Sequence, residues 1–448
     1  MTMDQIVGYA NHYGYVFQGS EIYGGLANTW DYGPLGARLK NNVKDEWRRA
    51  FIQARDQSFE LDSAILMNPM VWKASGHLDG FTDPLLDCKS CKSRHRADNL
   101  IADFDPAAHP DAMTLPAMLA FIRENRVPCP RCGRSDFTDI RTFNLMFATR
   151  RGVTEEGADT IYLRPENAQG EYVNYLNLAR VGRCAPPFGV GQIGKAFRNE
   201  ITPGNFTFRT IEFEQMEYQM FVKPGTDEAY YEEFKRFAMD FLVSLGLPRE
   251  KLRFRDHEKL AHYAKAACDI EYLFPFGWGE VNGTHNRGDF DLSRHQELSG
   301  RSMEARDEAT GERYLPRVVE STCGADRVAL ALLCEGLVEE GERLVMKLAP
   351  RLAPIKINIL PLIKKKHGER ARALYEELRR KFPVTYDEAG NIGRRYRRGD
   401  AVGTPFAVTV DDDTLEKNTV TLRHRDNMEQ ETIPAEALGA RLGAALEP

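Results

Sequence analysis

The chain has 448 residues, more than one hydrophobic core usually supports, so we expect two to four domains. With 42% hydrophobic and 28% charged residues, the composition argues against disorder and against a coiled coil. The formal net charge of -6 excludes a protein that holds nucleic acid by bulk charge alone, although a local basic patch stays compatible with it.

No apolar run approaches the ~18 residues that a membrane helix needs, so we expect no membrane partner. The first residues lack the charged and apolar regions of a signal peptide. We therefore expect a cytoplasmic protein whose cysteines are reduced.

Apolar residues at a spacing of four predict a helix after the turn formed by Gly33 and Pro34. The stripe consists of Leu35, Leu39, Val43, Trp47 and Phe51. The next segment, 59–77, is short and extended in character. Because proline cannot donate a hydrogen bond within a sheet, Pro69 predicts an edge strand or a strand that breaks there.

Residues 82–159 are polar, carry two cysteine pairs and contain one short helical pattern at 115–126, so we interpret them as an insertion. The pairs are the CxxC motifs Cys88/Cys91 and Cys129/Cys132. Four thiolates in this pattern are typical of tetrahedral Zn²⁺, and all-cysteine ligation leaves no open coordination position, so the metal would be structural. A redox pair or free thiols is the alternative.

The segments after the insertion alternate between strand and helix patterns. We expect a strand running into a helix over 160–180, two strands over 187–201 and 206–222 around a turn at 202–205, and a helix over 227–246. Further strands are expected at 251–257, 269–283 and 313–323.

The second of the two strands around the turn combines an arginine, aromatic rings and acids. Alternate residues of a strand share a face, which groups Arg209, Ile211, Phe213, Gln215 and Glu217. Glu212 and Glu214 are expected on the opposite face. Arginine suits phosphate oxygens, a phenyl ring suits a flat heterocycle, and acids suit an ammonium group. The face predicts a site for a nucleotide plus an amino acid, and a hairpin of internal salt bridges is the alternative.

A helix is expected to begin after Gly324. The free amides and dipole of a helix N-terminus favour anions, and Arg327 would lie in the first turn. Combined with Arg198 on the first strand, this end would supply a second phosphate clamp. An ordinary helix start is the alternative.

From about residue 353, strand and helix patterns alternate again and predict a small three-layer α/β domain. Its run of arginines, Arg394, Arg395, Arg397 and Arg398, surrounds Tyr396. Arginine with an interleaved aromatic residue suits phosphate contact and base stacking on RNA. A solvated loop is the alternative.

These segments together resemble the three motifs of class II aminoacyl-tRNA synthetases. Residues 198–200, a turn and residues 209–213 are similar to motif 2, and residues 324–327 are similar to motif 3. The helix from Gly36 and the segment with Pro69 resemble motif 1, which builds the dimer interface in that family.

More narrowly, the chain resembles the dimeric type of glycyl-tRNA synthetase. The matching segments are WDYGPLG (30–36), SGH (75–77), RAD (96–98), LRPE-AQG (163–170), FRNEITPGNF (197–206) and GTPFAVTVD (403–411). Two departures concern the site: Ile211 replaces an arginine of the family, and Ser321 with Thr322 replaces a proline and a serine. Thr322 retains the hydroxyl group.

The resemblance implies an α+β catalytic core over residues 1–81 and 160–350, with an antiparallel sheet flanked by helices. It implies a zinc-bearing insertion at 82–159 and a C-terminal three-layer α/β anticodon-binding domain at 351–448. A homodimer is also implied.

The resemblance further implies the residues that contact the substrates. Glycine would be bound by Arg96, Glu166, Phe213, Glu214, Gln215, Met216, Glu217, Glu320, Thr322 and Gly324. ATP would be bound by Arg198, Asn199, Glu200, Phe208, Arg209, Thr210, Ile211, Glu212, Phe213, Glu280, Val281, Gly324, Ala325, Asp326 and Arg327. The catalytic residues would be Arg198 at the α-phosphate and Arg327 at the far end of the triphosphate, with Phe213 stacked on adenine and Glu280 or Glu320 helping to place Mg²⁺.

The activity implied is that of an ATP-dependent, AMP-forming ligase, which converts glycine to glycyl-adenylate and transfers it to the 3′ end of tRNA(Gly). Two other interpretations stay open: a non-catalytic, synthetase-like tRNA-binding or accessory protein, and a class II synthetase for another small amino acid. The motif arginines and pocket acids favour an enzyme, and the LRPE-AQG and FEQME segments favour glycine.

Overall fold

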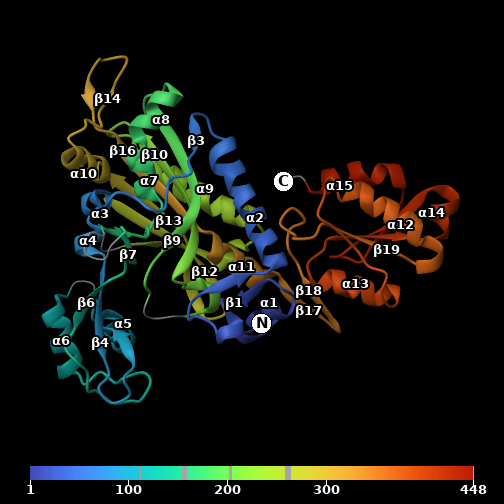
Figure 1. Cartoon of the computed structure of the whole chain (residues 1–448), viewed down its shortest axis with the longest axis horizontal. Coiled ribbons are helices and arrows are strands. Elements are labelled where there is room, and N and C mark those ends of the chain that lie inside the picture. Colours follow the sequence, from blue (N-terminus) through green and yellow to red (C-terminus); the bar gives the residue numbers. More distant parts are fainter. Residues whose placement is uncertain (111–112, 154–158, 201–203, 258–263, 447–448) are drawn as a thin grey trace.

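The computed structural model describes residues 1–448 except 111–112, 154–158, 201–203, 258–263 and 447–448. Figure 1 shows a large central body, a small lobe formed by the insertion, and a C-terminal domain on the other side of the body. No helix in the described part of the chain is both long and apolar enough to cross a membrane.

A seven-stranded sheet forms the centre of the large body. The strand order is β11-β12-β13-β16-β10-β9-β3. The bounds are β3 Ser58–Glu60, β9 Phe188–Phe197, β10 Glu212–Val222, β11 Leu252–Asp256, β12 Ala266–Phe274, β13 Gly277–Gly288 and β16 Arg317–Gly324. Neighbouring strands are antiparallel except for β3 and β9. The predicted α+β class with a large, antiparallel-rich sheet is confirmed.

Two groups of helices cover the two faces of this sheet. One face packs against α1 Met3–His12, α2 Pro34–Arg48, α9 Asp227–Ser244 and α11 Ala325–Gly336. The other packs against α7 Ala168–Val173, α8 Tyr175–Gly182 and α10 Phe290–Ser299. Met216 and Tyr218 of β10 belong to the first core and Phe221 to the second. The strand therefore alternates between its faces as predicted.

The helix α2 confirms the predicted apolar stripe, since Leu39, Val43 and Trp47 are all buried. The strand expectation for Pro69 is wrong, because Pro69 opens helix α3, Pro69–Ala74. A proline at the first helical position loses no hydrogen bond there, and the Asn68 side chain caps the helix by accepting from the Met70 amide at 2.9 Å.

The predicted hairpin is present, but its second strand is shorter than expected. β10 begins at Glu212, after a 3₁₀ turn at Phe206–Phe208, so Arg209 lies outside the strand. Part of the turn expected at 202–205 lies outside the described residues. The remaining short elements of the body are β1 Val16–Gln18, β2 Trp30–Tyr32, α4 His77–Gly80, β14 Ala305–Arg306 and β15 Arg313–Tyr314.

The inserted lobe has its own small core between a sheet and two helices. Its sheet has the order β5-β4-β6, with β4 Thr82–Asp87, β5 Arg94–Arg96 and β6 Arg141–Asn144. The helices are α5 Ala97–Phe104 and α6 Leu115–Glu124, and a hairpin of β7 Ala148–Arg151 and β8 Asp159–Tyr162 returns the chain to the body. The predicted helical piece is confirmed. The division into domains at residues 82, 160 and 351 stays a prediction.

The C-terminal domain is a five-stranded mixed sheet with the order β20-β19-β21-β22-β23. Its strands are β19 Ile357–Pro361, β20 Val384–Tyr386, β21 Phe406–Val410, β22 Thr419–His424 and β23 Gln430–Pro434. Its helices are α12 Lys364–Leu378, α13 Ile392–Ala401, α14 Asp412–Lys417 and α15 Leu438–Leu446. In Figure 1, α12 and α15 lie on one side of the sheet and α13 on the other, as expected for three layers.

The alternative of a solvated arginine loop is wrong, because the arginine-rich run forms helix α13, capped by Asn391. Arg395 is buried and donates to the carbonyls of Pro361 and Leu362. Arg394 and Arg397 remain on the exposed surface. Arg398 is also exposed and pairs with Asp387. The run therefore divides into one structural arginine, one exposed arginine in an ion pair, and two further arginines that face solvent.

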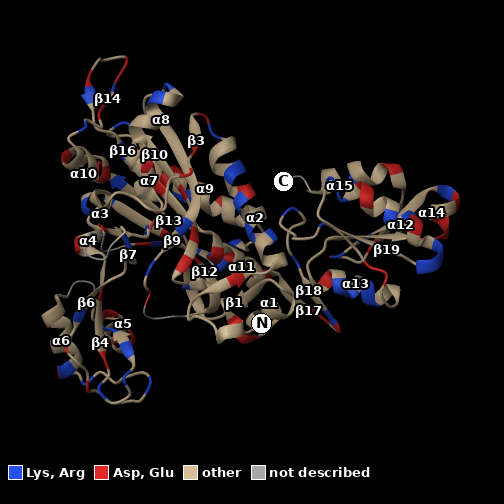
Figure 2. Ribbon diagram, in the orientation of Figure 1, with Lys and Arg blue, Asp and Glu red and all other residues tan. Residues whose placement is uncertain are grey.

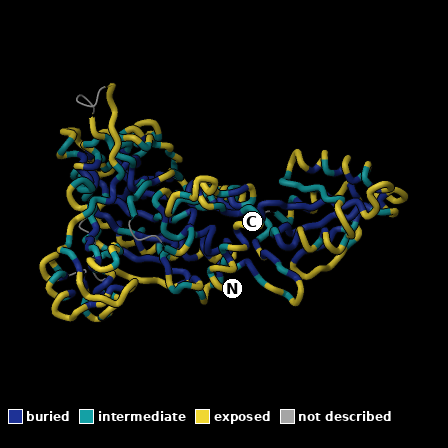
Figure 3. Tube along the Cα trace, turned by 60° about the horizontal axis from the view of Figure 1, so that its bottom comes forward, coloured by how far each residue is buried: buried dark blue, intermediate teal, exposed yellow. Residues whose placement is uncertain are grey.

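The C-terminal domain contacts the body through the end of α13. The Tyr9 hydroxyl donates to the Ala401 carbonyl at 2.7 Å. Arg343, on the hairpin of β17 Leu337–Glu340 and β18 Arg343–Met346, pairs with buried Asp400 at 3.0 Å. Figure 3 shows buried chain continuing from the body into this domain.

Candidate active site

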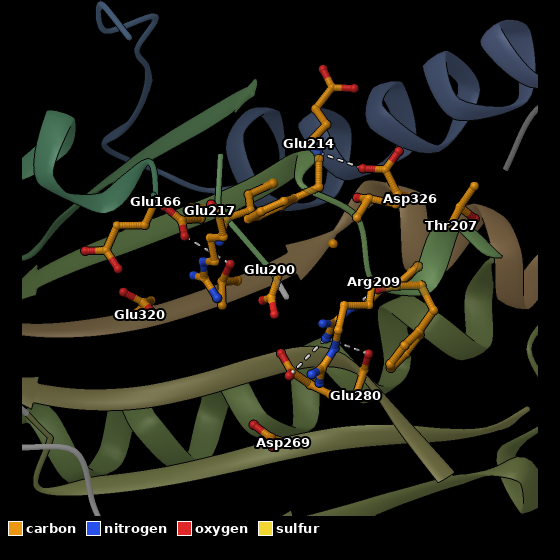
Figure 4. Close-up of a pocket in the computed structure, with 18 of the residues that line it drawn as sticks. Glu166, Glu200, Thr207, Arg209, Glu214, Glu217, Asp269, Glu280, Glu320 and Asp326 are labelled. Carbon is orange, nitrogen blue, oxygen red and sulfur yellow. Dashed lines mark hydrogen bonds and ion pairs between the residues drawn. The ribbon is translucent and has the colours of Figure 1, made fainter. Parts of the chain in front are cut away.

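A cavity of about 240 Å³ lies on the large sheet, between the 3₁₀ turn, the strands β10, β13 and β16, and the start of α11. Its lining residues are Glu166, Arg198, Glu200, Thr207, Phe208, Arg209, Thr210, Phe213, Glu214, Gln215, Glu217, His257, Asp269, Glu280, His285, Arg287, Glu320, Thr322, Gly324, Asp326 and Arg327. Figure 4 shows Glu166, Glu217 and Glu320 at one end, with Arg209 and Glu280 at the other. The cavity thus has an acidic end and an end where arginines and acids are mixed.

Glu217 is the acid whose charge is least balanced by its neighbours. It is 2% exposed, and its Oε1 accepts a hydrogen bond from the Thr322 hydroxyl at 3.2 Å. Its Oε2 has no hydrogen-bond partner among the described residues. Burial, followed by repulsion from Glu320 and Glu166, raises the pKa of Glu217 well above its usual range.

The other two acids at this end have basic neighbours that favour their ionised forms. Glu320 accepts from Arg287 at 3.0 Å and lies 2.8 Å from Nδ1 of His285. Burial alone would raise the pKa of Glu320, but these two partners outweigh it and lower the pKa to about 2. Glu166 lies 3.4 Å from Nε2 of His77. Burial opposes ionisation here too, yet His77 and Arg287 hold the pKa of Glu166 below its usual range.

At the other end, Arg198 and Arg327 lie against aromatic rings. The Arg198 guanidinium lies 5.3 Å from the ring centre of Phe213 and donates to the Pro165 carbonyl at 3.0 Å. The Arg327 guanidinium lies 4.4 Å from the ring centre of Phe208 and pairs with Glu280 at 3.0 Å. Planar cations on ring faces are fixed in orientation and can present donors to an anion.

Several predicted contact residues line the cavity but are tied to the scaffold. Lys40 forms ion pairs with both Glu214 and Asp326, at 3.0 and 2.9 Å. Asp326 also accepts from the Glu214 amide at 2.6 Å. These two acids fasten α2 and α11 to β10, so their charges are largely balanced within the protein.

Other predicted residues lie outside the cavity lining. Met216, Val281 and Ala325 are buried in the core. Glu212 is exposed and pairs with Lys195, and the Ile211 amide donates to the Asn28 carbonyl at 3.2 Å. The Asn199 amide donates to the Leu145 carbonyl, also away from the cavity. Arg96, in the inserted lobe, pairs with Asp83 at 2.9 Å and Asp98 at 2.6 Å. The structure does not bring these residues to the cavity.

Five further residues line the cavity without having been predicted from the sequence: Thr207, His257, Asp269, His285 and Arg287. His285 and Arg287 are two residues apart on β13 and share a face, but they lie beyond the end of the predicted strand at residue 283. His257 lies 2.7 Å from Asp269 on the neighbouring strand, a contact with no local sequence signal.

The four cysteines of the inserted lobe form a second candidate site. Their sulfur atoms all lie within 4.8 Å of one another, with Cys88 to Cys132 at 3.6 Å and Cys91 to Cys129 at 3.7 Å. A tetrahedron with zinc–sulfur bonds of ~2.3 Å has sulfur–sulfur edges of about 3.8 Å. The geometry therefore fits a four-coordinate metal ion.

Comparison with known proteins gives consistent results. A family model described as an anticodon binding domain matches residues 352–444. The glycine–tRNA ligase of Caldanaerobacter subterraneus subsp. tengcongensis is 54% identical over 440 residues, which cover 96% of this chain and 95% of the relative. That of Alkaliphilus oremlandii is 53% identical over 457 residues (100% and 99%), and that of Geobacillus thermodenitrificans is 53% identical over 452 residues (98% and 97%). Because these identities extend over nearly the whole of both chains, the chain belongs to the glycine–tRNA ligase family.

Proposed function

We propose that the chain is an ATP-dependent ligase that joins glycine to tRNA(Gly) through glycyl-adenylate. The observation that carries the proposal is the cavity itself, in which an unbalanced, buried glutamate faces arginines held on aromatic rings. Family membership supports the choice of glycine and tRNA as substrates.

In the first step, the glycine carboxylate attacks the α-phosphate of ATP and pyrophosphate leaves. A carboxylate is already ionised at neutral pH, so the step needs no general base. It needs alignment of the reacting atoms and neutralisation of charge. We assign Arg198 to the α-phosphate, Arg327 to the far end of the triphosphate, and the ring of Phe213 to stacking on adenine.

The glycine ammonium group is assigned to Glu217, with Glu166 and Glu320 beside it. Glu320 already neutralises Arg287 and His285, so its charge is mostly used within the protein. Within the described part of the chain, the Thr322 hydroxyl is the one hydrogen-bond partner of Glu217, and Oε2 of Glu217 has none. Side chains close to the bound glycine would exclude a larger amino acid by steric clash, which discriminates better than an unfilled apolar hole.

In the second step, a hydroxyl of the terminal ribose of the tRNA attacks the acyl carbon and AMP leaves. The C-terminal domain is assigned to the anticodon end of the tRNA. Exposed Arg394 and Arg397 on α13 are suited to its phosphates. Figure 2 shows basic residues on this helix.

Two metal ions complete the proposal. Mg²⁺ neutralises phosphate charge when bound. Glu280 is the better placed carboxylate for it, because its side chain is 43% exposed and pairs with Arg327, whereas Glu320 is buried and held by both Arg287 and His285. Zn²⁺ would be held by Cys88, Cys91, Cys129 and Cys132 as a structural ion. We also propose a homodimer in the cytoplasm, on the resemblance alone.

Pyrophosphate exchange into ATP, measured with each amino acid in turn, tests the function. We expect exchange with glycine and none above background with alanine or serine. Exchange with another small amino acid would reassign the substrate. Absence of exchange with every amino acid, in a protein that still binds tRNA, would favour a non-catalytic accessory role.

A further inference from the structure

Helix α7 lies across the part of β10 that carries Glu217. Just before the helix, the Asn167 side chain donates to the Gln215 carbonyl at 3.1 Å. Near the end of the helix, the Tyr172 hydroxyl donates to Oε1 of Gln219 at 2.8 Å. Glu217 lies between these two contacts on the strand, and Glu171 lies between them on the helix. The arrangement therefore places the two carboxyl groups on facing elements, near enough for the charge of Glu217 to raise the pKa of Glu171.

Glu171 is completely buried, and neither of its carboxyl oxygens has a hydrogen-bond partner among the described residues. Asn167, Gln192, Gln215 and Glu217 also have a buried side-chain atom without a hydrogen-bond partner among the described residues. Burying an ionised carboxylate without a partner is far more costly than burying the neutral acid. The Glu171 side chain is therefore expected to keep its proton.

The charges around Glu171 agree with this state. Burial, then repulsion from Glu217 on β10 and Glu320 on β16, raises the pKa of Glu171 well above its usual range. Arg164, which precedes α7, and Arg287 on β13 oppose this rise without reversing it. The Arg287 guanidinium is committed to Asp291 and Glu320.

A buried acid at this position needs an explanation, because the neighbouring side chains of α7, Ala168 and Tyr172, belong to an apolar core. A leucine would fill similar space without leaving polar atoms unpaired. A neutral carboxyl, unlike leucine, offers one O–H donor, and the free oxygen of Glu217 is an acceptor.

We propose that Glu171 is a positioning residue for the ammonium group of glycine: it keeps its proton and donates that hydrogen to Glu217, directly or through a buried water, once Glu217 has ionised. In the empty pocket Glu217 holds a proton of its own. The incoming ammonium group displaces this proton to the solvent, which leaves one ammonium group, one carboxylate and one neutral acid. This inference rests on the proposed function, because it takes glycine as the ligand.

Two substitutions with side chains of similar size distinguish the effect of the hydrogen-bond donor at position 171 from the effect of side-chain volume. Glu171→Gln keeps a neutral donor, whereas Glu171→Leu removes it. Since a hydrogen bond to a charged group is worth about 10- to 100-fold in affinity, the leucine variant should raise the glycine KM at least about tenfold. The glutamine variant should stay within about threefold of the wild type. The kcat at saturating glycine should change little in either variant, because the contact serves binding.

Two further readouts distinguish positioning from a structural role. Calorimetry of glycine binding in buffers of different ionisation enthalpy should show close to one proton released per glycine near pH 7.5 in the wild type and in Glu171→Gln. The melting temperature of Glu171→Leu should rise even though its glycine affinity falls, since a buried unpaired carboxyl is removed.

The inference is overturned if Glu171→Leu binds glycine like the wild type, if Glu171→Gln loses glycine binding, or if no proton is released. Should the leucine variant fail to fold, the glutamine variant and the wild-type proton count still decide. Failure of the proposed function would look different, because the wild type itself would then show no glycine-dependent pyrophosphate exchange.

Discussion

The glutamates at the acidic end of the cavity differ in ionisation state because their neighbours differ. Arg287 and His285 favour the ionised form of Glu320, and His77 favours that of Glu166. Among the residues that the structure describes, Glu217 has one hydrogen-bond partner, a hydroxyl group, and repulsion from Glu320 and Glu166 outweighs the attraction of Arg287. A neutral, buried acid is ready to exchange its proton for an ammonium group, so Glu217 is the residue on which glycine binding should depend most.

Glu217→Gln should raise the KM for glycine at least about 100-fold, because a glutamine side chain cannot ionise to pair with the ammonium group. The KM for ATP should change by less than about threefold, since the arginines are untouched. Pyrophosphate exchange at varied glycine and ATP measures both. Glu232→Gln, an exposed acid on α9, is the matched control and should behave like the wild type. A normal glycine KM in Glu217→Gln would refute the pocket assignment.

Glu171 should also make the stability of the protein depend on pH. Its pKa is higher in the folded protein than in the unfolded chain, so the folded state holds a proton that the unfolded state loses above about pH 4.5. Stability therefore falls as pH rises through that window, by up to ~1.4 kcal/mol per pH unit. Glu171→Leu lacks this loss, and its stability advantage should grow between pH 5.5 and 7.5 in urea titrations. A pH-independent difference would contradict the raised pKa.

The identity of the site residues was more predictable from the sequence than their state. Glu166, Glu217 and Glu320 line the same cavity, although Glu166 and Glu320 lie 154 positions apart in the sequence. They could be grouped in advance because each lies in a segment that resembles a motif of the family. Their ionisation depends on His77, His285 and Arg287, and the last two belong to a strand in which no motif was identified. Charge balance arises from tertiary contacts, and a single sequence does not show it.

At the scale of elements, the helices and strands with a clear period were predictable and those that depend on capping were not. The stripe on α2 and the alternation on β10 follow from periodicity alone. Pro69 was assigned to a strand because proline breaks sheets, but the preceding asparagine makes it the first residue of a helix. No helix was predicted for the arginine run, which nevertheless forms α13 with Asn391 as its cap.

Substitutions at different arginines of helix α13 should affect either tRNA binding or stability. Replacing exposed Arg394 and Arg397 together with alanine should weaken tRNA binding about tenfold or more and reduce its dependence on salt, because two phosphate contacts are lost. Pyrophosphate exchange should stay unchanged. Arg395→Ala is the contrasting variant: it removes the donor to three carbonyls, of which that of Pro361 is in a buried hydrogen bond, and should lower the melting temperature. Unchanged tRNA affinity in the double variant would exclude α13 from the RNA contact.

The inserted lobe should depend on its metal ion. The purified protein should contain close to one zinc per chain, and Cys88→Ser should remove it, since each ligand contributes to a closed tetrahedral site. Loss of the ion should expose residues 82–159 to proteolysis while the large sheet stays intact, because the lobe has a separate core. Cys334→Ser, outside the cluster, is the matched control. Less than half a zinc per chain would contradict the assignment.

At the scale of the whole molecule, the residues that attach the C-terminal domain to the body differ from those that line the cavity. The domain is fastened by the hydroxyls of Tyr9 and Tyr15 and by the Arg343–Asp400 pair. None of these residues lines the described cavity. Activation of the amino acid should therefore be separable from recognition of the tRNA.

Removing residues 354–448 should preserve glycine-dependent pyrophosphate exchange within about tenfold and reduce tRNA charging by about 100-fold or more, because two linked binding sites gain that much from acting together. The chain should end at Ala353, since Asn42 binds the carbonyls of Leu352 and Ala353, and Leu352 belongs to the core of the body. Circular dichroism and melting of the shortened chain establish that it folds. If a folded, shortened chain lost both activities, the domain would be part of the catalytic unit rather than a tRNA-binding partner to it.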